Sequence, residues 1–166
     1  EPEPARAQER AREVEPSRAN DTSRTEHDRK IAEIRALNAA IKDLVVSEKI
    51  DRIEQLTVSV FTAVEDSPEK MPQISKFMNY YLPTALKLLT HYSRLERQSL
   101  GGENIARSKR DIESILDKLI EGFEHQLDQL YSADVIDITA DINVLETMMA
   151  KDGLTRNEYV FRKPGE

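Results

Sequence analysis

The feature that most constrains the fold is a run of apolar side chains in the middle of the chain, spaced at steps of three and four residues. The run consists of Ile74, Met78, Tyr81, Ala85, Leu88, Tyr92 and Leu95. This spacing is typical of an α-helix that buries one face. Pro83 falls inside the run, and because it has no N–H to donate to the Asn79 carbonyl, we expect a kink there.

Similar stripes flank this segment and predict an all-α fold. We expect helices over residues 26–65, 72–99, 103–132 and 139–151. An unbroken first helix would measure about 60 Å, against about 42 to 45 Å for its partners, so we expect a break near the capping residue Ser47. Leu100-Gly101-Gly102 should end the central helix, because glycine accepts the left-handed C′ conformation. The prediction is an up-down helical bundle of three long helices plus a short C-terminal helix, with disordered termini.

The N-terminal segment differs in composition from the predicted helices. Residues 1–25 contain three prolines, six acidic and five basic residues, and almost no large apolar side chain. Such a segment buries too little surface to offset the entropy of ordering. We therefore predict a disordered linker over 1–25, a helical bundle domain over 26–153 and a flexible tail over 154–166.

Few patterns in the sequence point to chemistry. The chain has no cysteine, which excludes thiol nucleophiles and thiolate metal sites. Glu121 and His125 lie one turn apart, an ordinary surface pair. Residues 137–143 alternate oxygen side chains like the start of a calcium loop, but the turn glycine and bidentate glutamate are missing, so helix capping is favoured. No catalytic residue, cofactor site or metal site is predicted.

One candidate surface for a protein partner lies beside Pro83. Tyr80 and Tyr81 point about 100° apart on a helix, so only one of them shares the core stripe. We assign Tyr81 to the core, and Tyr80 with Thr84 and Lys87 to a partner-binding surface. The alternative, in which both rings are core and Pro83 only bends the helix around them, stays open.

The charges are distributed unevenly along the chain. Residues 70–110 hold eight basic and two acidic residues, whereas residues 111–152 hold eleven acidic and two basic ones. The candidates for contact with an anionic surface, such as a membrane, are Arg94, Arg97, Arg107, Lys109 and Arg110. An up-down bundle of three helices would add Arg29, Lys30 and Arg35 at the same end. Alternatively, the two sets pair as the hairpin closes, at about 0 to 1 kcal/mol per exposed pair.

Nucleic acid is not an expected partner. The net charge of −7 opposes it, and no aromatic residues accompany the basic cluster. The sequence contains no run of about 18 apolar residues that would span a bilayer.

Two blocks of sequence resemble a known family. They are Tyr80-Tyr81-Leu82-Pro83-Thr84, continued by Leu86 to Leu89 and Tyr92, and residues 141–149 followed by Asp152-Gly153-Leu154. Both are similar to the bromo-chloroindolyl phosphate hydrolysis protein (XpaC-like) family. Members usually carry membrane segments ahead of this region, which implies a cytoplasmic domain tethered by an anchor outside this chain. The family's name implies phosphate-ester hydrolysis, with no catalytic motif to carry over.

Two functions of different classes follow from these observations. The first is a non-enzymatic helical adaptor or scaffold module that binds a protein partner, with a basic tip and an acidic base. The alternative is a phosphate-ester hydrolase, as the family name implies. The sequence does not indicate a substrate, a partner's identity or an oligomeric state.

Overall fold

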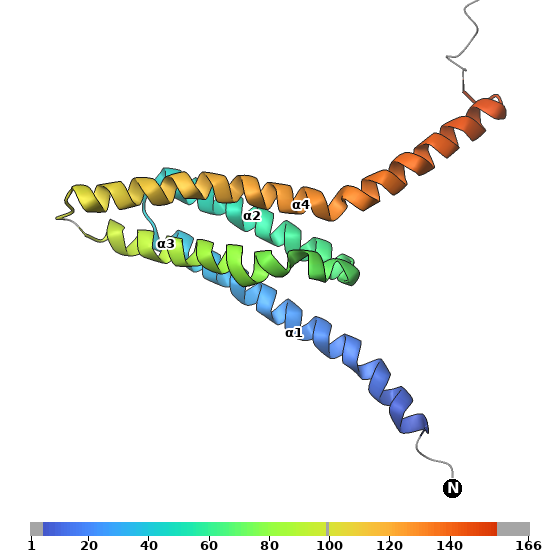
Figure 1. Cartoon of the computed structure of the whole chain (residues 1–166), viewed down its shortest axis with the longest axis horizontal. Helices are drawn as coiled ribbons and strands as arrows, with labels where there is room; N and C mark the ends of the chain where they lie inside the picture. The colour runs from blue at the N-terminus through green and yellow to red at the C-terminus, as the bar shows by residue number, and fades with distance from the viewer. Residues whose placement is uncertain (1–4, 99, 156–166) are drawn as a thin grey trace, which may run out of the picture. The chain divides into compact units, whose positions relative to one another are not determined.

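The computed structural model describes the backbone of residues 5–98 and 100–155, and the side chains from residue 21 onward within these ranges. Its elements are α1 (Ala5–Ala40), α2 (Leu44–Asp66), the 3₁₀-helix η1 (Pro68–Ile74), the π-helix η2 (Phe77–Tyr81), α3 (Leu82–Glu96) and α4 (Glu103–Lys151) (Figure 1). The described residues contain no strand, so the all-α prediction is confirmed.

The chain divides into two compact units, residues 1–130 and 131–166, and the boundary falls within α4. In the first unit, successive helices reverse direction. His27 of α1 lies 2.9 Å from Glu65 at the end of α2, and Asn38 donates to Asp51 near its start. Glu96, at the end of α3, reaches the α1–α2 connection, while Phe77 ahead of α3 contacts Phe123 of α4. Figure 1 shows α2, α3 and the first part of α4 side by side.

The first predicted helix is in fact two helices, and the break lies at residues 41–43 rather than at Ser47. Asp43 is the N-cap of α2, and its carboxylate accepts the Val46 N–H at 2.9 Å. Ser47 instead donates its hydroxyl to Asn38 across the α1–α2 hairpin. The first unit therefore contains four long helical segments instead of three, since the chain reverses once more than predicted.

The N-terminal boundary of α1 also differs from the prediction. The helix extends back to Ala5, across most of the segment predicted to be a disordered linker. Residues 1–4 and 156–166, which include most of the predicted tail, lie outside the described residues. The domain boundaries at 26 and 153 stay predictions.

The central segment is less regular than a kinked α-helix. A 3₁₀-helix begins at Pro68 and is followed by a π-helix, in which the Leu82 N–H donates to the Phe77 carbonyl. This wider turn ends at Tyr81, two residues before Pro83, and shifts the buried face. Phe77, Leu82, Ala85, Leu86, Leu89 and Tyr92 are buried. Tyr81 is 45% exposed, so its assignment to the core was wrong.

No break separates the last two predicted helices, which form the single helix α4. Neither glycine nor proline occurs between residues 123 and 152, so nothing in the backbone interrupts the helix. Residues 137–143 consequently lie inside α4 and form neither a calcium loop nor a cap. Gly153, with φ of 71°, follows the last turn, whereas neither Gly101 nor Gly102 has the positive φ expected of a left-handed C′ glycine.

A row of aromatic rings fills one end of the core. The His27 ring stacks on Phe61 at 4.0 Å, Phe61 meets Phe77 edge-on at 6.2 Å, and Phe77 meets Phe123 at 4.7 Å. His27 is only 3% exposed, although its position in the sequence placed it near a frayed helix start. The row joins α1, α2, η2 and α4, and its last two rings form the floor of a groove.

Candidate functional site

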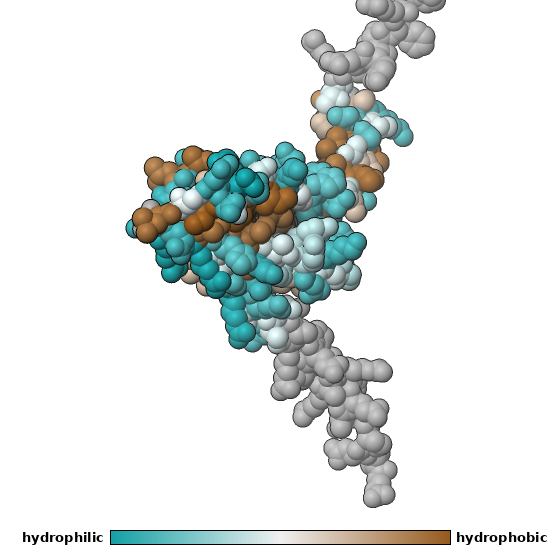
Figure 2. Space-filling view, turned by 60° about the vertical axis from the view of Figure 1, so that its left-hand side comes forward, coloured by the Kyte–Doolittle hydropathy of each residue, from teal (hydrophilic) through white to brown (hydrophobic). Residues whose placement is uncertain are grey.

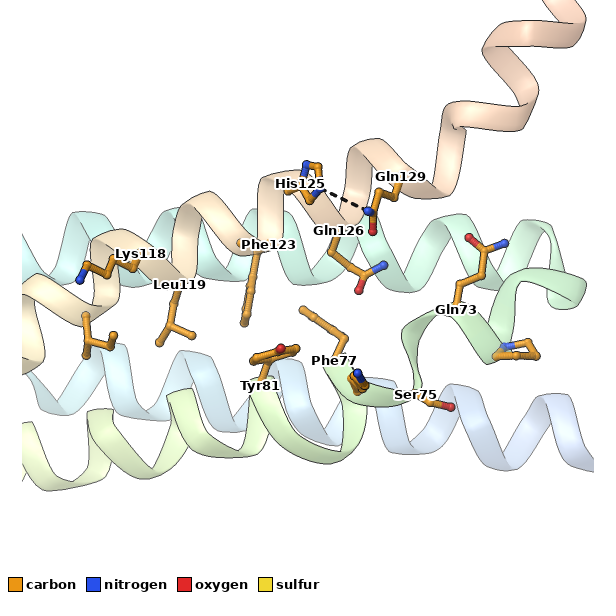
Figure 3. Close-up of a pocket in the computed structure, with 14 residues that line it drawn as sticks. Gln73, Ser75, Phe77, Tyr81, Lys118, Leu119, Phe123, His125, Gln126 and Gln129 are labelled. Atoms are coloured by element: carbon orange, nitrogen blue, oxygen red, sulfur yellow. Dashed lines mark hydrogen bonds between the residues drawn. The ribbon is translucent and has the colours of Figure 1, made fainter.

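A groove of about 680 Å³ lies between the η1–η2 segment and α4, entirely within the first unit. Its apolar lining comes from Phe77, Tyr81, Ile115, Leu119 and Phe123. Its polar lining includes Lys76, Lys118, His125, Gln126 and Gln129. Figure 3 shows Phe77 and Phe123 directed toward each other from the two sides, with Tyr81 beside them.

The irregular helices explain why a groove forms here. The π-turn over Phe77–Tyr81 contains one residue more than a turn of α-helix. Phe77, five positions before the buried Leu82, therefore lies on the same inner face, and Tyr81 stays at the rim. On the opposite wall, Gly122 of α4 contributes no side chain beside Phe123. Two aromatic rings thus form a buried floor that stays open to solvent above.

The charges around the groove have one sign. Its lining contains Lys76 and Lys118 but no Asp or Glu, although the chain as a whole carries a net charge of −7. Both lysines are exposed, and neither forms a salt bridge within the described part of the chain. The groove therefore combines an apolar floor with a positive rim, an arrangement suited to an apolar group that carries negative charge.

His125 is the one histidine in the groove. It was expected to pair with Glu121, but the Gln129 amide nitrogen lies 3.2 Å from its Nε2 instead (Figure 3). No carboxylate lines the groove to orient this ring for acid–base chemistry. In the part of the chain that the structure covers, no three or more His, Asp or Glu side chains are grouped to hold a metal ion.

The predicted partner surface lies next to the groove. Tyr80 is 64% exposed, Lys87 is exposed and Thr84 is half-buried. The Tyr80 ring meets that of Tyr81 edge-on at 5.4 Å, and Tyr81 itself lines the groove. The alternative that both rings belong to the core is therefore wrong, while a role in partner binding stays a prediction.

The predicted basic cluster lies at the end of the first unit that contains the Gly101-Gly102 turn. Arg94, Arg97, Arg107 and Arg110 are exposed there, and the Lys109 ammonium lies 5.5 Å from the centre of the Tyr92 ring. Arg107 pairs with Glu103 at 3.6 Å.

The expected contribution of α1 to this cluster was wrong. His27 pairs with Glu65 at the opposite end of the first unit, which places Arg29 and Lys30 there as well. Arg35 pairs with Glu54 in the middle of α2. The reversal at residues 41–43 explains the error, because it turns the start of α1 away from the Gly101-Gly102 turn.

Apolar side chains accompany the basic cluster at the same end. Leu100, in the turn, is 98% exposed, while Leu44 and Val45, at the start of α2, are 79% and 59% exposed. The start of α2 lies near the end of α3 because Glu96 accepts the N–H groups of Lys42 and Asp43 at 2.7 and 2.9 Å. Figure 2 shows hydrophobic side chains (brown) among the polar ones on the surface of this unit.

Comparison with known proteins gave a family match. A family model described as 5-bromo-4-chloroindolyl phosphate hydrolysis protein matches residues 5–145. No curated protein matched. No solved structure matched either. Among the described residues, no helix combines the length and the apolar character needed to cross a membrane.

Proposed function

The chain belongs to the 5-bromo-4-chloroindolyl phosphate hydrolysis protein family, and from that premise and the groove we propose a non-enzymatic helical adaptor that binds a segment of a partner protein. The bound segment presents an apolar or aromatic side chain to Phe77 and Phe123 and places a carboxylate near Lys76 or Lys118. The observation that carries this proposal is an aromatic floor whose rim has two lysines and no acidic residue.

The size and the surroundings of the groove support a protein ligand. Pockets that bury a few anchoring side chains supply much of the affinity in protein interfaces, and tyrosine is enriched around them. The exposed Tyr80–Tyr81 pair adjoins the groove and extends the contact area. The predicted surface of Tyr80, Thr84 and Lys87 then becomes one side of a single binding region.

Site-specific photo-crosslinking in the native cell tests this proposal. A photoreactive phenylalanine replaces Gln126, which lines the groove and is half-buried. We expect one or more defined protein adducts, which disappear when Lys76→Glu and Lys118→Glu are introduced together. The matched control is Lys42→Glu, an exposed lysine outside the groove, which should leave the adducts unchanged. Adducts that survive the double reversal would contradict the proposal.

A phosphate-ester hydrolase is the second candidate, and the same groove favours it. Lys76, Lys118 and His125 could neutralise a phosphate whose aromatic group lies on Phe77 and Phe123. The test is turnover of 5-bromo-4-chloroindolyl phosphate by the pure chain, with and without Mg²⁺, Mn²⁺ or Zn²⁺. Activity that co-elutes with the protein and is lost in both His125→Ala and Lys118→Ala would replace the adaptor proposal.

We also propose that the end with the Gly101-Gly102 turn lies against an anionic membrane surface. The exposed arginines of that end supply attraction to anionic headgroups, and Leu44, Val45 and Leu100 supply apolar contacts. An adaptor held at a membrane in this way keeps its groove accessible, because the groove lies along the side of the bundle.

A further inference from the structure

The second unit carries an apolar stripe on α4 with the spacing of a coiled coil. Successive steps of four and three residues connect Tyr131, Val135, Ile138, Ile142, Leu145 and Met149. We call these six residues the α4 seam. Val135, Ile138, Ile142 and Leu145 are 57%, 57%, 48% and 58% exposed. Figure 2 shows hydrophobic side chains at the surface of this part of α4.

The seam has the properties of an interface rather than of scattered surface residues. A strict 4–3 repeat keeps the same stripe facing a partner helix along its length. In heptad terms, Val135, Ile142 and Met149 occupy the a positions, and Tyr131, Ile138 and Leu145 occupy the d positions, so every core position of the repeat carries an apolar or aromatic side chain. Met149 is half-buried, and Met148 beside it is 57% exposed.

The flanking charges indicate what kind of helix fits. The e and g positions hold three acidic residues, Asp134, Asp141 and Glu146, and no basic one. Two copies of the chain in parallel would place Asp141 beside Glu146 of the other copy, and an antiparallel pair would bring the Asp134–Asp141 flanks together. An anionic lipid surface would be repelled by the same residues. A second copy of the chain and an anionic membrane would therefore each bring negative charges together at the seam.

We infer that the α4 seam binds an amphipathic helix of another protein that carries Lys or Arg on both sides of its apolar stripe. Such a helix buries the seam and pairs its basic flanks with Asp141 and Glu146, as e and g positions do in specific coiled coils. This interface lies in the second unit and is independent of the groove, so either can be disproved without the other.

Two synthetic helical peptides of three heptads test the inference with the full chain. Both carry Ile at a and Leu at d, and one has Lys at every e and g position while the other has Glu. In fluorescence anisotropy titrations at about 0.15 M salt, where surface charges are only partly screened, we expect the Lys peptide to bind at least tenfold more tightly than the Glu peptide. Equal affinities would overturn the charge argument.

Matched variants of the chain locate the interface. Ile138→Ser with Ile142→Ser removes two seam positions, and we expect at least a tenfold loss in affinity for the Lys peptide. Ile136→Ser with Val144→Ser removes two apolar residues that are 70% and 59% exposed but lie off the seam, and binding should persist. Equal losses in both variants would contradict the seam. Sedimentation of wild-type chain as a dimer that the seam variant abolishes would assign the seam to a second copy.

Discussion

At the residue scale, Tyr92 shows how packing sets the chemistry of a side chain. Its ring is fully buried, and its hydroxyl donates to a Glu113 carboxylate oxygen at 3.0 Å. Burial raises the pKa of Tyr92, and the hydrogen bond to Glu113 raises it further. In the unfolded chain the phenol ionises near pH 10, so the stability that this residue contributes is complete below that pH and is lost progressively above it.

Tyr92→Phe isolates this effect. Between pH 8 and pH 11, we expect the unfolding free energy of the wild-type protein to fall by about 1.4 kcal/mol more than that of the variant. The reason is that the Tyr92 phenol loses its proton in the unfolded wild-type chain but keeps it in the folded one, whereas the variant has no phenol at this position. At pH 8 the variant should be less stable by about 0.5 to 1.5 kcal/mol, the contribution of one hydrogen bond. Urea unfolding followed by circular dichroism measures both quantities. Parallel pH curves for wild type and Tyr92→Phe would contradict the assignment.

At the scale of the elements, the predictions from the sequence were correct where the local spacing of apolar residues determines the structure. The helical stripes identified α2, α3 and the first part of α4. The break in the first helix depended on a contact that periodicity cannot reveal. Asp43 and Ser47 are both good capping residues, and the contact of Glu96, more than fifty positions away, with the Lys42 and Asp43 N–H groups favours the break at Asp43.

The groove was missed for a related reason. Pro83 located the irregularity within a few residues, but an α-helical period assigns Tyr81, not Phe77, to the inner face. The π-turn reverses that assignment, and Phe77 then meets Phe123 of α4. The sequence offers no local signal for the extra residue in this turn.

The contact between Glu96 and the α1–α2 connection predicts a measurable loss of stability. Glu96→Gln keeps the size of the side chain but removes its charge and replaces one of the two oxygens that accept the Lys42 and Asp43 N–H groups by a donor amide. We expect a cost of about 1.5 to 3 kcal/mol, the range for hydrogen bonds to a charged group. Glu48→Gln, at an exposed residue of α2, is the matched control and should cost less than about 0.5 kcal/mol. Chemical denaturation measures both, and equal small effects would show that Glu96 does not anchor the connection.

At the scale of the whole molecule, the two units should differ in stability. The buried hydrophobic side chains in the described residues run from Ile34 to Leu130, all within the first unit. A chain shortened to residues 1–133 should therefore melt within about 2 °C of the full chain, since little of the core is removed. Thermal unfolding followed by circular dichroism measures this, and a fall of 8 °C or more would mean that residues 134–166 stabilise the first unit.

The last prediction concerns the basic and apolar end near the Gly101-Gly102 turn. The chain has no tryptophan, so Leu100→Trp places a single indole at an apolar position that is 98% exposed. With phosphatidylserine vesicles at low salt, its emission should shift to the blue as the ring enters the interface, because each nearby basic residue adds about 1 kcal/mol of attraction. The shift should disappear at about 0.5 M salt, where the Debye length is only a few ångströms. It should also disappear when Arg107→Glu and Arg110→Glu are added.

Tyr80→Trp, exposed beside the groove, is the matched control, and its emission should not shift. A Leu100→Trp spectrum that ignores vesicles, or an equal shift at position 80, would refute membrane contact through this end.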